Sequence, residues 1–279
     1  MGKVSKIEFL KEKAIELRKT ALTMIHEANS GHPGGSLSAA DIMAALYFDE
    51  LRLNPNDPQW EDRDRFVLSK GHVCPILYSA LAIRGFFPLE EIYTLRKYGS
   101  ILQGHPDMKR CPGIDISTGS LGQGISCAVG MAIAYKRDKK DARVFVLLGD
   151  GETNEGQVWE AVESAVKYSL DNLVIIIDNN GLQNDGTCAE IMPTQDLYEK
   201  FKAFGCKVYH IDGHDMEQIV DVLSKARNDK GCGKPIAIVA KTVKGRGVSF
   251  MENVVKWHGV APNDEEYEIA MKELEGGLK

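Results

Sequence analysis

Hydrophobic residues follow two different spacings along the chain, and the clearest change of spacing lies at its centre. Residues 144–148 are all apolar, the run breaks at Gly-Asp-Gly (149–151), and helix-period spacing continues from about 154 to 168. A second apolar run, 173–177, ends at Asp-Asn-Asn (178–180). Continuous apolar runs predict strands that are covered on both faces, and a helix between them makes the two strands parallel.

The same alternation of strands and helices continues on both sides of this central unit. It predicts helices at about 5–28 and 38–50, from 75, from 88, up to 137, at 195–203 and 216–228, and from 262, and strands at 65–69, 207–211 and 236–241. Ser38 followed by Asp41 is typical of a capping box at the start of the second helix. Small residues on every face of the helix that ends near Arg137 predict that it is buried. We therefore expect one α/β domain over residues 1–279, with an open, mostly parallel sheet flanked by helices.

The composition excludes several classes of protein. Hydrophobic residues make up 43% of the chain and the formal net charge is −6, which allows a sizeable core and argues against a protein that coats nucleic acid. The six cysteines form no C-x-x-C pair and lack a histidine spacing suited to zinc, so we expect reduced thiols and a cytoplasmic location. Charges run through the first turns, unlike in a signal peptide, and no apolar run is long enough to span a membrane.

The ends of the two central strands carry the first candidate site. Asp150 and Asn180 follow parallel strands and should meet at the carboxyl edge of the sheet, where open α/β sheets bind ligands. Their oxygens suit Mg²⁺ or Ca²⁺ but are too few to hold the ion alone. Gly149 and Gly151 let a ligand approach the backbone, and a helix N-terminus near Asn154 favours an anion. A diphosphate meets both demands, although Gly-Asp-Gly also occurs in ordinary strand-to-helix turns.

Four of the seven histidines lie in loops bordered by glycine. They are His32, His72, His105 and His258. Glycine beside an imidazole leaves room for a ligand, and imidazole can donate, accept or carry a proton near neutral pH. Any one of them alone is better explained as a hydrogen-bonded loop residue. His214 precedes Asp215, which we expect to cap a helix, so we interpret that pair as structural.

Taken together, these segments resemble one family. GDG followed about thirty residues later by NN resembles the signature of thiamine diphosphate enzymes, and GDG-x-x-x-EG with DNN is similar to transketolase. The segments SGHPGGS, RFVLSKGH, GHPD with TGSLGQGIS, and WHG resemble transketolase blocks in their order and spacing. The resemblance extends over nearly the whole chain. On the basis of these motifs, the chain is identified as a member of the transketolase family.

The resemblance implies a metal site and a cofactor site. Asp150, Asn180 and the backbone carbonyl of Leu182 would hold Mg²⁺, or Ca²⁺ as a substitute, and this ion would bridge to the diphosphate of thiamine diphosphate. His72 and His258 would contact the diphosphate itself. Four further residues would border the cofactor: Gly119, Leu121, Gly149 and Gly151.

The resemblance also assigns residues to the sugar and to an interface. His105 would contact the hydroxyketone end of the donor sugar, and His32 with His258 the reacting oxygen. Glu155, which would also lie near the cofactor, and Glu160 match acidic positions that lie toward the dimer interface in the family. A favourable interaction with the helix dipole explains these two carboxylates equally well. Asn184 departs from the pattern, because transketolases commonly have an apolar residue there, beneath the thiazolium ring.

A partner chain is a further implication. In the family, a glutamate that bonds the aminopyrimidine ring and the arginines that grip the sugar phosphate come from other domains, whereas this chain has strands for one sheet only. We therefore expect a partner that carries the pyrimidine-binding and C-terminal domains, in an α2β2 assembly that acts on phosphorylated sugars. The implied reaction moves a two-carbon ketol unit from a ketose phosphate to an aldose phosphate, as in the pentose phosphate pathway. We expect neither nucleic acid nor membrane as a partner.

Other interpretations stay open at this point. Within the same class, the chain could be the α-subunit of a 2-oxoacid dehydrogenase, a deoxyxylulose-phosphate synthase fragment, or a transketolase for unusual sugars. GDG-x-x-N also matches phosphate-transferring ATPases, but these need an aspartyl nucleophile after a strand, and the D-x-D at 62–64 precedes its strand. A non-catalytic binding protein derived from the family is a third possibility, against which the complete set of diphosphate-side residues argues.

Overall fold

A computed structural model of the chain describes residues 2–277, so residues 1, 278 and 279 of the predicted domain lie outside the described part. Within this part, five strands form one sheet in the order β1-β2-β3-β5-β4. They are β1 (Arg65–Leu68), β2 (Val144–Gly149), β3 (Leu173–Asn179), β4 (Lys207–Asp212) and β5 (Ile236–Lys241). All adjacent strands are parallel, which confirms the predicted α/β class.

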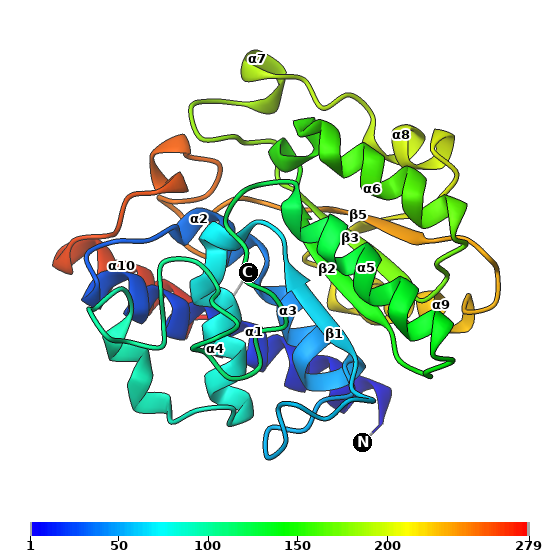
Figure 1. The fold of residues 1–279 in the computed structure, drawn as a ribbon. Helices are drawn as coiled ribbons and strands as arrows, with labels where there is room; N and C mark the ends of the chain where they lie inside the picture. The colour runs from blue at the N-terminus through cyan, green and yellow to red at the C-terminus, as the bar shows by residue number, and fades with distance from the viewer. Residues whose placement is uncertain (1, 278–279) are drawn as a thin grey trace.

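Helices cover both faces of the sheet (Figure 1). One layer consists of α1 (Lys3–Glu27), α3 (Ala40–Ala45), α4 (Cys74–Arg84) and α9 (Met216–Asn228), and the other of α5 (Gln123–Arg137), α6 (Gly156–Lys167) and α8 (Leu197–Ala203). The remaining helical elements are α2 (Pro33–Ser38), η1 (Leu46–Glu50), η2 (Gly71–Val73), η3 (Leu89–Thr94), η4 (Gly151–Asn154), α7 (Cys188–Ile191), η5 (Val255–His258) and α10 (Asp264–Glu275).

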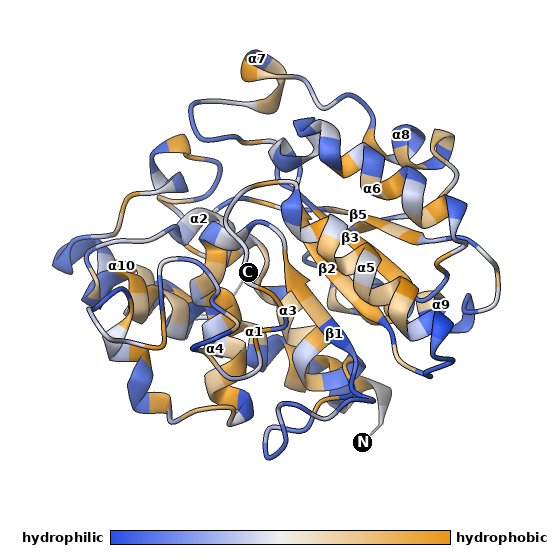
Figure 2. Ribbon diagram, viewed as in Figure 1, coloured by the Kyte–Doolittle hydropathy of each residue, from blue (hydrophilic) through white to orange (hydrophobic). Residues whose placement is uncertain are grey.

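The two helical layers explain why the strands are apolar without alternation. In β2, Phe145 and Leu147 belong to the core under α1, α3, α4 and α9, whereas Val146 and Leu148 belong to the core under α5, α6 and α8. Figure 2 shows the central strands as hydrophobic along their length. Since both faces of each strand are buried, no position along them favours a polar residue.

The order of the strands determines which loops meet at the carboxyl edge. From β1 through β2 and β3 to β4, the chain moves in one direction across the sheet, and α5, α6 and α8 lie on the same face. It then returns to β5 through α9 on the opposite face, as right-handed crossovers require. Because β5 lies between β3 and β4, the loop after β5 ends up beside the tip of β3.

The predicted helix over 38–50 is wrong in its start. Ser38 is the last residue of α2, and its hydroxyl donates a hydrogen bond to Asp178 Oδ2 at 2.5 Å. Asp41 is buried in α3 and bonds the guanidinium of Arg18. The capping box therefore does not form, because both side chains have partners in the interior instead. The helical segment continues through α3 into the short π-helical turn η1.

Two further predictions need correction. Small residues cover every face of α5, but Cys127 and Gly130 are exposed in this chain, because only one side of the helix packs against the sheet and α6. The helix predicted after Pro88 is the short 3₁₀ element η3.

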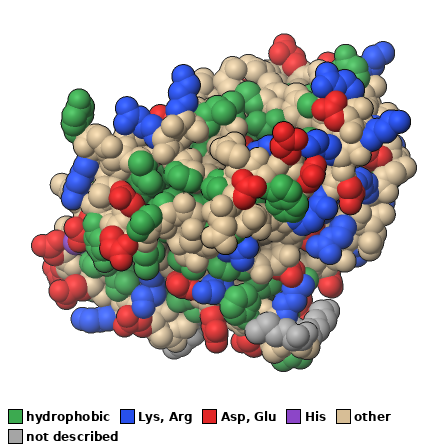
Figure 3. Space-filling model, turned by 60° about the horizontal axis from the view of Figure 1, so that its bottom comes forward, with side chains coloured by type: hydrophobic (Ala, Val, Ile, Leu, Met, Phe, Trp, Pro, Cys, Tyr) green, Lys and Arg blue, Asp and Glu red, His purple; other side chains and the backbone are tan. Residues whose placement is uncertain are grey.

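Within the described residues, no helix is long and apolar enough to cross a membrane. All six cysteines are free thiols, and acidic and basic side chains are interspersed on the face shown in Figure 3.

Candidate functional site

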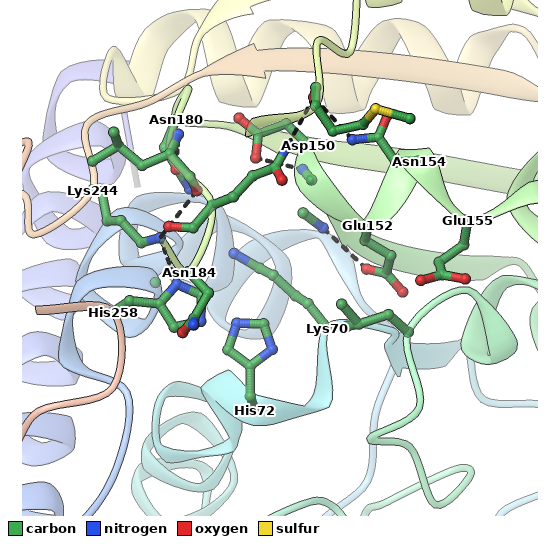
Figure 4. Close-up of a pocket in the computed structure, with 17 residues that line it drawn as sticks. Lys70, His72, Asp150, Glu152, Asn154, Glu155, Asn180, Asn184, Lys244 and His258 are labelled. Atoms are coloured by element: carbon green, nitrogen blue, oxygen red, sulfur yellow. Dashed lines mark hydrogen bonds between the residues drawn. The ribbon is translucent and has the colours of Figure 1, made fainter. Parts of the chain in front are cut away.

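The carboxyl ends of β2 and β3 form the floor of a cavity of about 340 Å³. Gly149 at the end of β2 pairs with Asp178 near the end of β3, so Asp150 and Asn180 follow two adjacent strand tips. Both line the cavity, and Figure 4 shows their side chains among the residues that surround it. The predicted meeting of these two residues at one sheet edge is therefore confirmed.

Asp150 is the most unusual group in the cavity. Its side chain is only 2% exposed, and it accepts hydrogen bonds from the N–H groups of Gly151 at 2.7 Å and Gly181 at 2.5 Å. Burial raises the pKa of this carboxyl despite both bonds, and the nearby charge of Asp178 adds to the rise. The charge of Lys70 lowers the pKa only in part, and no ion pair to Asp150 occurs among the described residues, so a bound cation would lower the free energy of the charged carboxylate.

Two neutral oxygens accompany this carboxylate. Asn180 Oδ1 accepts from the N–H of Leu182 at 3.1 Å, which folds the loop after β3 back on itself. The carbonyl of Leu182 accepts from Lys244 Nζ at 3.0 Å. No group of three or more His, Cys, Asp or Glu side chains that could hold a metal occurs among residues 2–277. One carboxylate with neutral oxygens fits a hard divalent cation whose remaining ligands come from an oxygen-rich anion.

The helix N-terminus expected near Asn154 is confirmed, with the N-cap of α6 at Glu155. A 3₁₀ turn, η4, follows Asp150, and α6 begins only at Gly156. The N–H of Gly151 donates to the Asp150 carboxylate. The backbone of the turn η4 therefore holds the carboxylate, and cationic side chains add positive charge toward an anion.

Lys244 is the first of the cavity residues that the sequence analysis missed. Its side chain is buried, and burial lowers its pKa to about 8. Besides the carbonyl of Leu182, its ammonium contacts His258 Nδ1 at 2.7 Å (Figure 4). Its signal in the sequence is a lysine placed just after the strand at 236–241, whose tip adjoins that of β3.

Lys70 and Glu152 were missed as well. Lys70 follows β1, lines the cavity and forms a buried ion pair with Asp178. Glu152 Oε1 accepts from Ser69 Oγ at 2.5 Å and Glu152 Oε2 from the N–H of Gly149 at 3.1 Å. Glu152 therefore links the ends of β1 and β2. A lysine before Gly-His and a glutamate after Gly-Asp-Gly, both at strand ends, were available signals.

Three of the four predicted histidines form one cluster beside the cavity. The ring centroids of His32 and His72 are 5.0 Å apart, those of His72 and His258 are 5.2 Å apart, and those of His32 and His258 are 5.6 Å apart. Burial lowers the pKa of His32 to about 4 and that of His258 to about 3, and lowers the pKa of His72 well below its usual value. The cluster therefore consists of neutral imidazoles near pH 7.

One ring nitrogen of this cluster is available to hydrogen-bond a ligand. The buried His32 Nδ1 has no hydrogen-bond partner within the described chain. His105 lies across from it in an exposed loop, and its ring packs so closely on Gly119 that a Cβ there would be 3.1 Å from His105 Cδ2. Gly119 has a φ of +154°, a backbone conformation that residues other than glycine rarely adopt.

The remaining predicted residues lie at the rim or outside. Leu121 and Glu155 line the cavity, as does the exposed Asn184, whose amide donates to Asp185. Glu155 occupies the N-cap position of α6 but its side chain forms no capping hydrogen bond. Glu160 is exposed on α6, away from the cavity lining. Glu155 and Glu160 thus have different surroundings, although the sequence analysis gave both the same two interpretations.

Comparison with known proteins gives a consistent result. The model of the family described as "Transketolase, thiamine diphosphate binding domain" matches residues 10–277. The chain is 44% identical to the 6-deoxy-6-sulfo-D-fructose transketolase subunit SqwG of Clostridium sp. (strain MSTE9), over 95% of this chain and 96% of that protein. It is 43% identical to an apulose-4-phosphate transketolase subunit of Phocaeicola vulgatus, over 96% of this chain and 94% of that protein.

Longer transketolases match over part of their length. Human transketolase is 45% identical over 91% of this chain but only 40% of its own sequence. The crystal structure of Campylobacter jejuni transketolase superposes with a TM-score of 0.91 and 35% identity, covering 97% of this chain and 43% of that one. These matches decide against the ATPase alternative. The chain belongs to the transketolase family of ketol-transferring enzymes and corresponds to that family's thiamine diphosphate-binding domain.

Proposed function

We propose that this chain, acting as one domain over residues 1–279, binds thiamine diphosphate through a divalent cation, Mg²⁺ or in its place Ca²⁺. Asp150, Asn180 and the carbonyl of Leu182 supply the protein ligands. The observation that carries this assignment is the buried Asp150 carboxylate, 2% exposed and with a raised pKa, beside two neutral oxygens and an open cavity. A divalent ion compensates the carboxylate and brings the diphosphate oxygens that complete its coordination.

The diphosphate side of the cofactor is held by groups of two kinds. Lys244, with a pKa of about 8, and the ion-paired Lys70 supply positive charge near pH 7. His72 and His258 are neutral there, so they bind phosphate oxygens by donating hydrogen bonds. Gly149 and Gly151 leave the backbone open beside Asp150, and Gly119, Leu121 and Glu155 border the rest of the cofactor.

The sugar binds on the histidine side. His32 has a buried and unpartnered Nδ1, which suits it to exchange a proton or hydrogen bond with a substrate hydroxyl or carbonyl oxygen. His258, 5.6 Å from it between ring centroids, shares this task, and His105 contacts the hydroxyketone end of the donor. Thiamine diphosphate, when bound, supplies the carbon nucleophile that carries the two-carbon ketol unit. The protein groups orient the sugar, keep water out and move protons at its oxygens.

The transfer requires a second chain in our proposal. Two relatives that this chain matches along nearly their full length are called transketolase subunits, whereas human transketolase is matched over 40% of its length. We infer that a partner with the pyrimidine-binding and C-terminal domains completes an α2β2 enzyme and grips a phosphorylated ketose and aldose. The two relatives are named for 6-deoxy-6-sulfo-D-fructose and apulose 4-phosphate, so members of the family are named for different sugar substrates. The pentose phosphate pathway and a cytoplasmic location remain predictions.

Calorimetry with thiamine diphosphate tests the binding part of this proposal. We expect heat of binding with Mg²⁺ and none with EDTA, and Mg²⁺-independent binding would contradict the assignment. Asp150→Asn should remove the signal, whereas Asp185→Asn, an exposed carboxylate in the adjoining loop, is the matched control. For catalysis, the chain and its co-purified partner should convert xylulose 5-phosphate and ribose 5-phosphate but not pyruvate. Substantial turnover by the chain alone would contradict the two-chain assembly.

A further inference from the structure

A chain of buried polar groups lies behind Lys244, outside the cavity. Arg18 in α1 is completely buried, and its guanidinium donates to Asp41 Oδ1 at 3.2 Å and Oδ2 at 2.5 Å. Asp41 Oδ2 also lies 2.8 Å from His214 Nδ1. The other ring nitrogen, His214 Nε2, accepts from the N–H of Val243 at 2.8 Å. Together the four groups connect α1, α3, the loop after β4 and the loop after β5.

The hydrogen bonds fix one tautomer of His214. Because Nε2 accepts from a backbone N–H, it must carry the lone pair, so the proton of the neutral ring is on Nδ1 and is donated to Asp41. Asp41 remains an acceptor: burial alone would raise its pKa, but Arg18 and His214 hold it at about 2. Adjacent Asp215 caps α9, as predicted, by accepting from Glu217 and Gln218, which fixes the loop that carries His214.

The bond to Val243 anchors the backbone immediately before Lys244. Gly245, the residue after Lys244, donates its N–H to the carbonyl of Gly34 at 2.9 Å. Lys244 is therefore held on both sides, and its side chain packs so closely on Gly34 that a Cβ there would be 2.9 Å from Lys244 Cγ. These anchors aim the Lys244 ammonium at the Leu182 carbonyl, 3.0 Å away.

We propose that His214 is a positioning residue that holds Val243 so that Lys244 faces the diphosphate of the magnesium-bound cofactor. The inference rests on the proposed function, because it assumes that Lys244 contacts that anion. The sequence analysis gave His214 a structural role only, and this proposal adds a second role. The imidazole donates to Asp41 through Nδ1, and through Nε2 it holds the backbone that positions Lys244. Through Asp41, the position of Lys244 also depends on α1, although Arg18 in that helix does not line the cavity.

Two substitutions separate the two hydrogen bonds of His214. In His214→Asn, the shorter amide occupies the place of Nδ1, so it can donate to Asp41 but leaves the Val243 N–H unpaired. In His214→Gln, the longer amide reaches the place of Nε2 and its oxygen can accept from Val243. His210→Asn is the matched control, since His210 is exposed on strand β4 and its imidazole forms no hydrogen bond among the described residues.

Affinity for magnesium thiamine diphosphate, measured by calorimetry on the full chain, should follow the Val243 bond. We expect His214→Asn to bind about tenfold more weakly, and His214→Gln and His210→Asn to stay within about twofold of the wild type. In a Lys244→Met background, His214→Asn should cause no further loss, because its effect acts through that lysine. Equal effects of Asn and Gln, or an undiminished effect in the Lys244→Met background, would show a structural role only.

A measurement on the wild type covers the case in which His214→Asn fails to fold. In ¹⁵N-histidine spectra, His214 should be neutral and protonated at Nδ1, and protonation at Nε2 would overturn the inference. The two proposals fail in distinguishable ways. A wild-type chain that does not bind the cofactor contradicts the proposed function and the role of His214 with it, whereas a binding wild type with an equally good His214→Asn variant contradicts the inference alone.

Discussion

Asp150 and Asp178 are buried aspartates at the tips of neighbouring strands, and their surroundings differ completely. Asp178 accepts from the ammonium of Lys70 and from the hydroxyls of Ser38 and Thr242. The carboxylate of Asp150 accepts from two backbone N–H groups, and among the described residues it forms no ion pair with a cationic side chain. One aspartate is therefore satisfied within the folded chain, whereas the other is not.

The pKa values of the two carboxyls shift in opposite directions. Burial would raise both, but the charge of Lys70 and three hydrogen bonds lower the pKa of Asp178, whereas two amides leave the pKa of Asp150 raised. The charge on Asp178 contributes to the stability of the fold. The charge on Asp150 costs free energy until a cation binds, which is the property expected of a binding site.

The largest effect should come from Asp178→Asn. This change leaves the ammonium of Lys70, only 2% exposed, without its counter-charge. Removing one partner of a buried ion pair typically costs about 3–5 kcal/mol. We therefore expect urea denaturation to show a loss of that size in the free energy of unfolding. A loss below about 1 kcal/mol would mean that Asp178 is no better satisfied than Asp150.

Asp150→Asn should have the opposite profile. It removes a buried charge without orphaning a cation, but the amide nitrogen leaves one of the two backbone N–H groups, of Gly151 or Gly181, without an acceptor. Because these two effects oppose each other, we expect the free energy of unfolding to fall by less than about 2 kcal/mol. Affinity for magnesium thiamine diphosphate should fall by at least about a hundredfold, or about 2.7 kcal/mol. Calorimetry and urea denaturation on the same samples measure both quantities. Lost stability with retained affinity would reverse the roles that we give to the two aspartates.

The sequence was informative where local pattern decides the structure. Two apolar runs with a helix between them were enough to predict that Asp150 and Asn180 meet, because parallel strands with a crossover helix end at the same edge. Most element bounds follow in the same way. The helix at 216–228 and the strand at 236–241 agree with α9 and β5 residue for residue.

The sequence was uninformative where partners come from distant segments. Asp178 obtains its donors from the loop after β1, from α2 and from the loop after β5, and nothing in the run 173–180 indicates this. Ser38 looked like a helix cap because the local pattern fits one, yet the fold turns it toward Asp178 instead. Lys244 became a cavity residue only because β5 is inserted between β3 and β4, and strand order is not encoded in local periodicity.

The pH dependence of stability should separate the two aspartates more finely. The contribution of Asp178, whose pKa is lowered on folding, is complete above its unfolded value of about 3.9 and is lost as the pH falls through the folded pKa. At Asp150, whose pKa is raised, the folded chain takes up a proton first, so stability rises as the pH falls through that pKa toward about 3.9.

Urea denaturation at several pH values measures this difference. Relative to Asp150→Asn, the wild type should gain stability as the pH falls from neutral toward about 4, because the pKa of Asp150 is raised on folding. Relative to Asp178→Asn, it should lose stability below about pH 4. A flat difference between the wild type and Asp150→Asn would mean that the pKa of Asp150 is not raised.

The smallest effects should come from the exposed carboxylates of α6, which extend the comparison to side chains that water already solvates. Glu155→Gln and Glu160→Gln should change the free energy of unfolding by less than about 0.5 kcal/mol, as should the control Glu163→Gln on the same helix. Glu155 stands at the N-cap position without a capping bond, so the helix gains little from its side chain. Sedimentation with the partner present then distinguishes the two interpretations. Weaker assembly for Glu155→Gln and Glu160→Gln but not Glu163→Gln would identify these carboxylates with an interface, whereas unchanged assembly in all three would leave only the helix dipole to explain them.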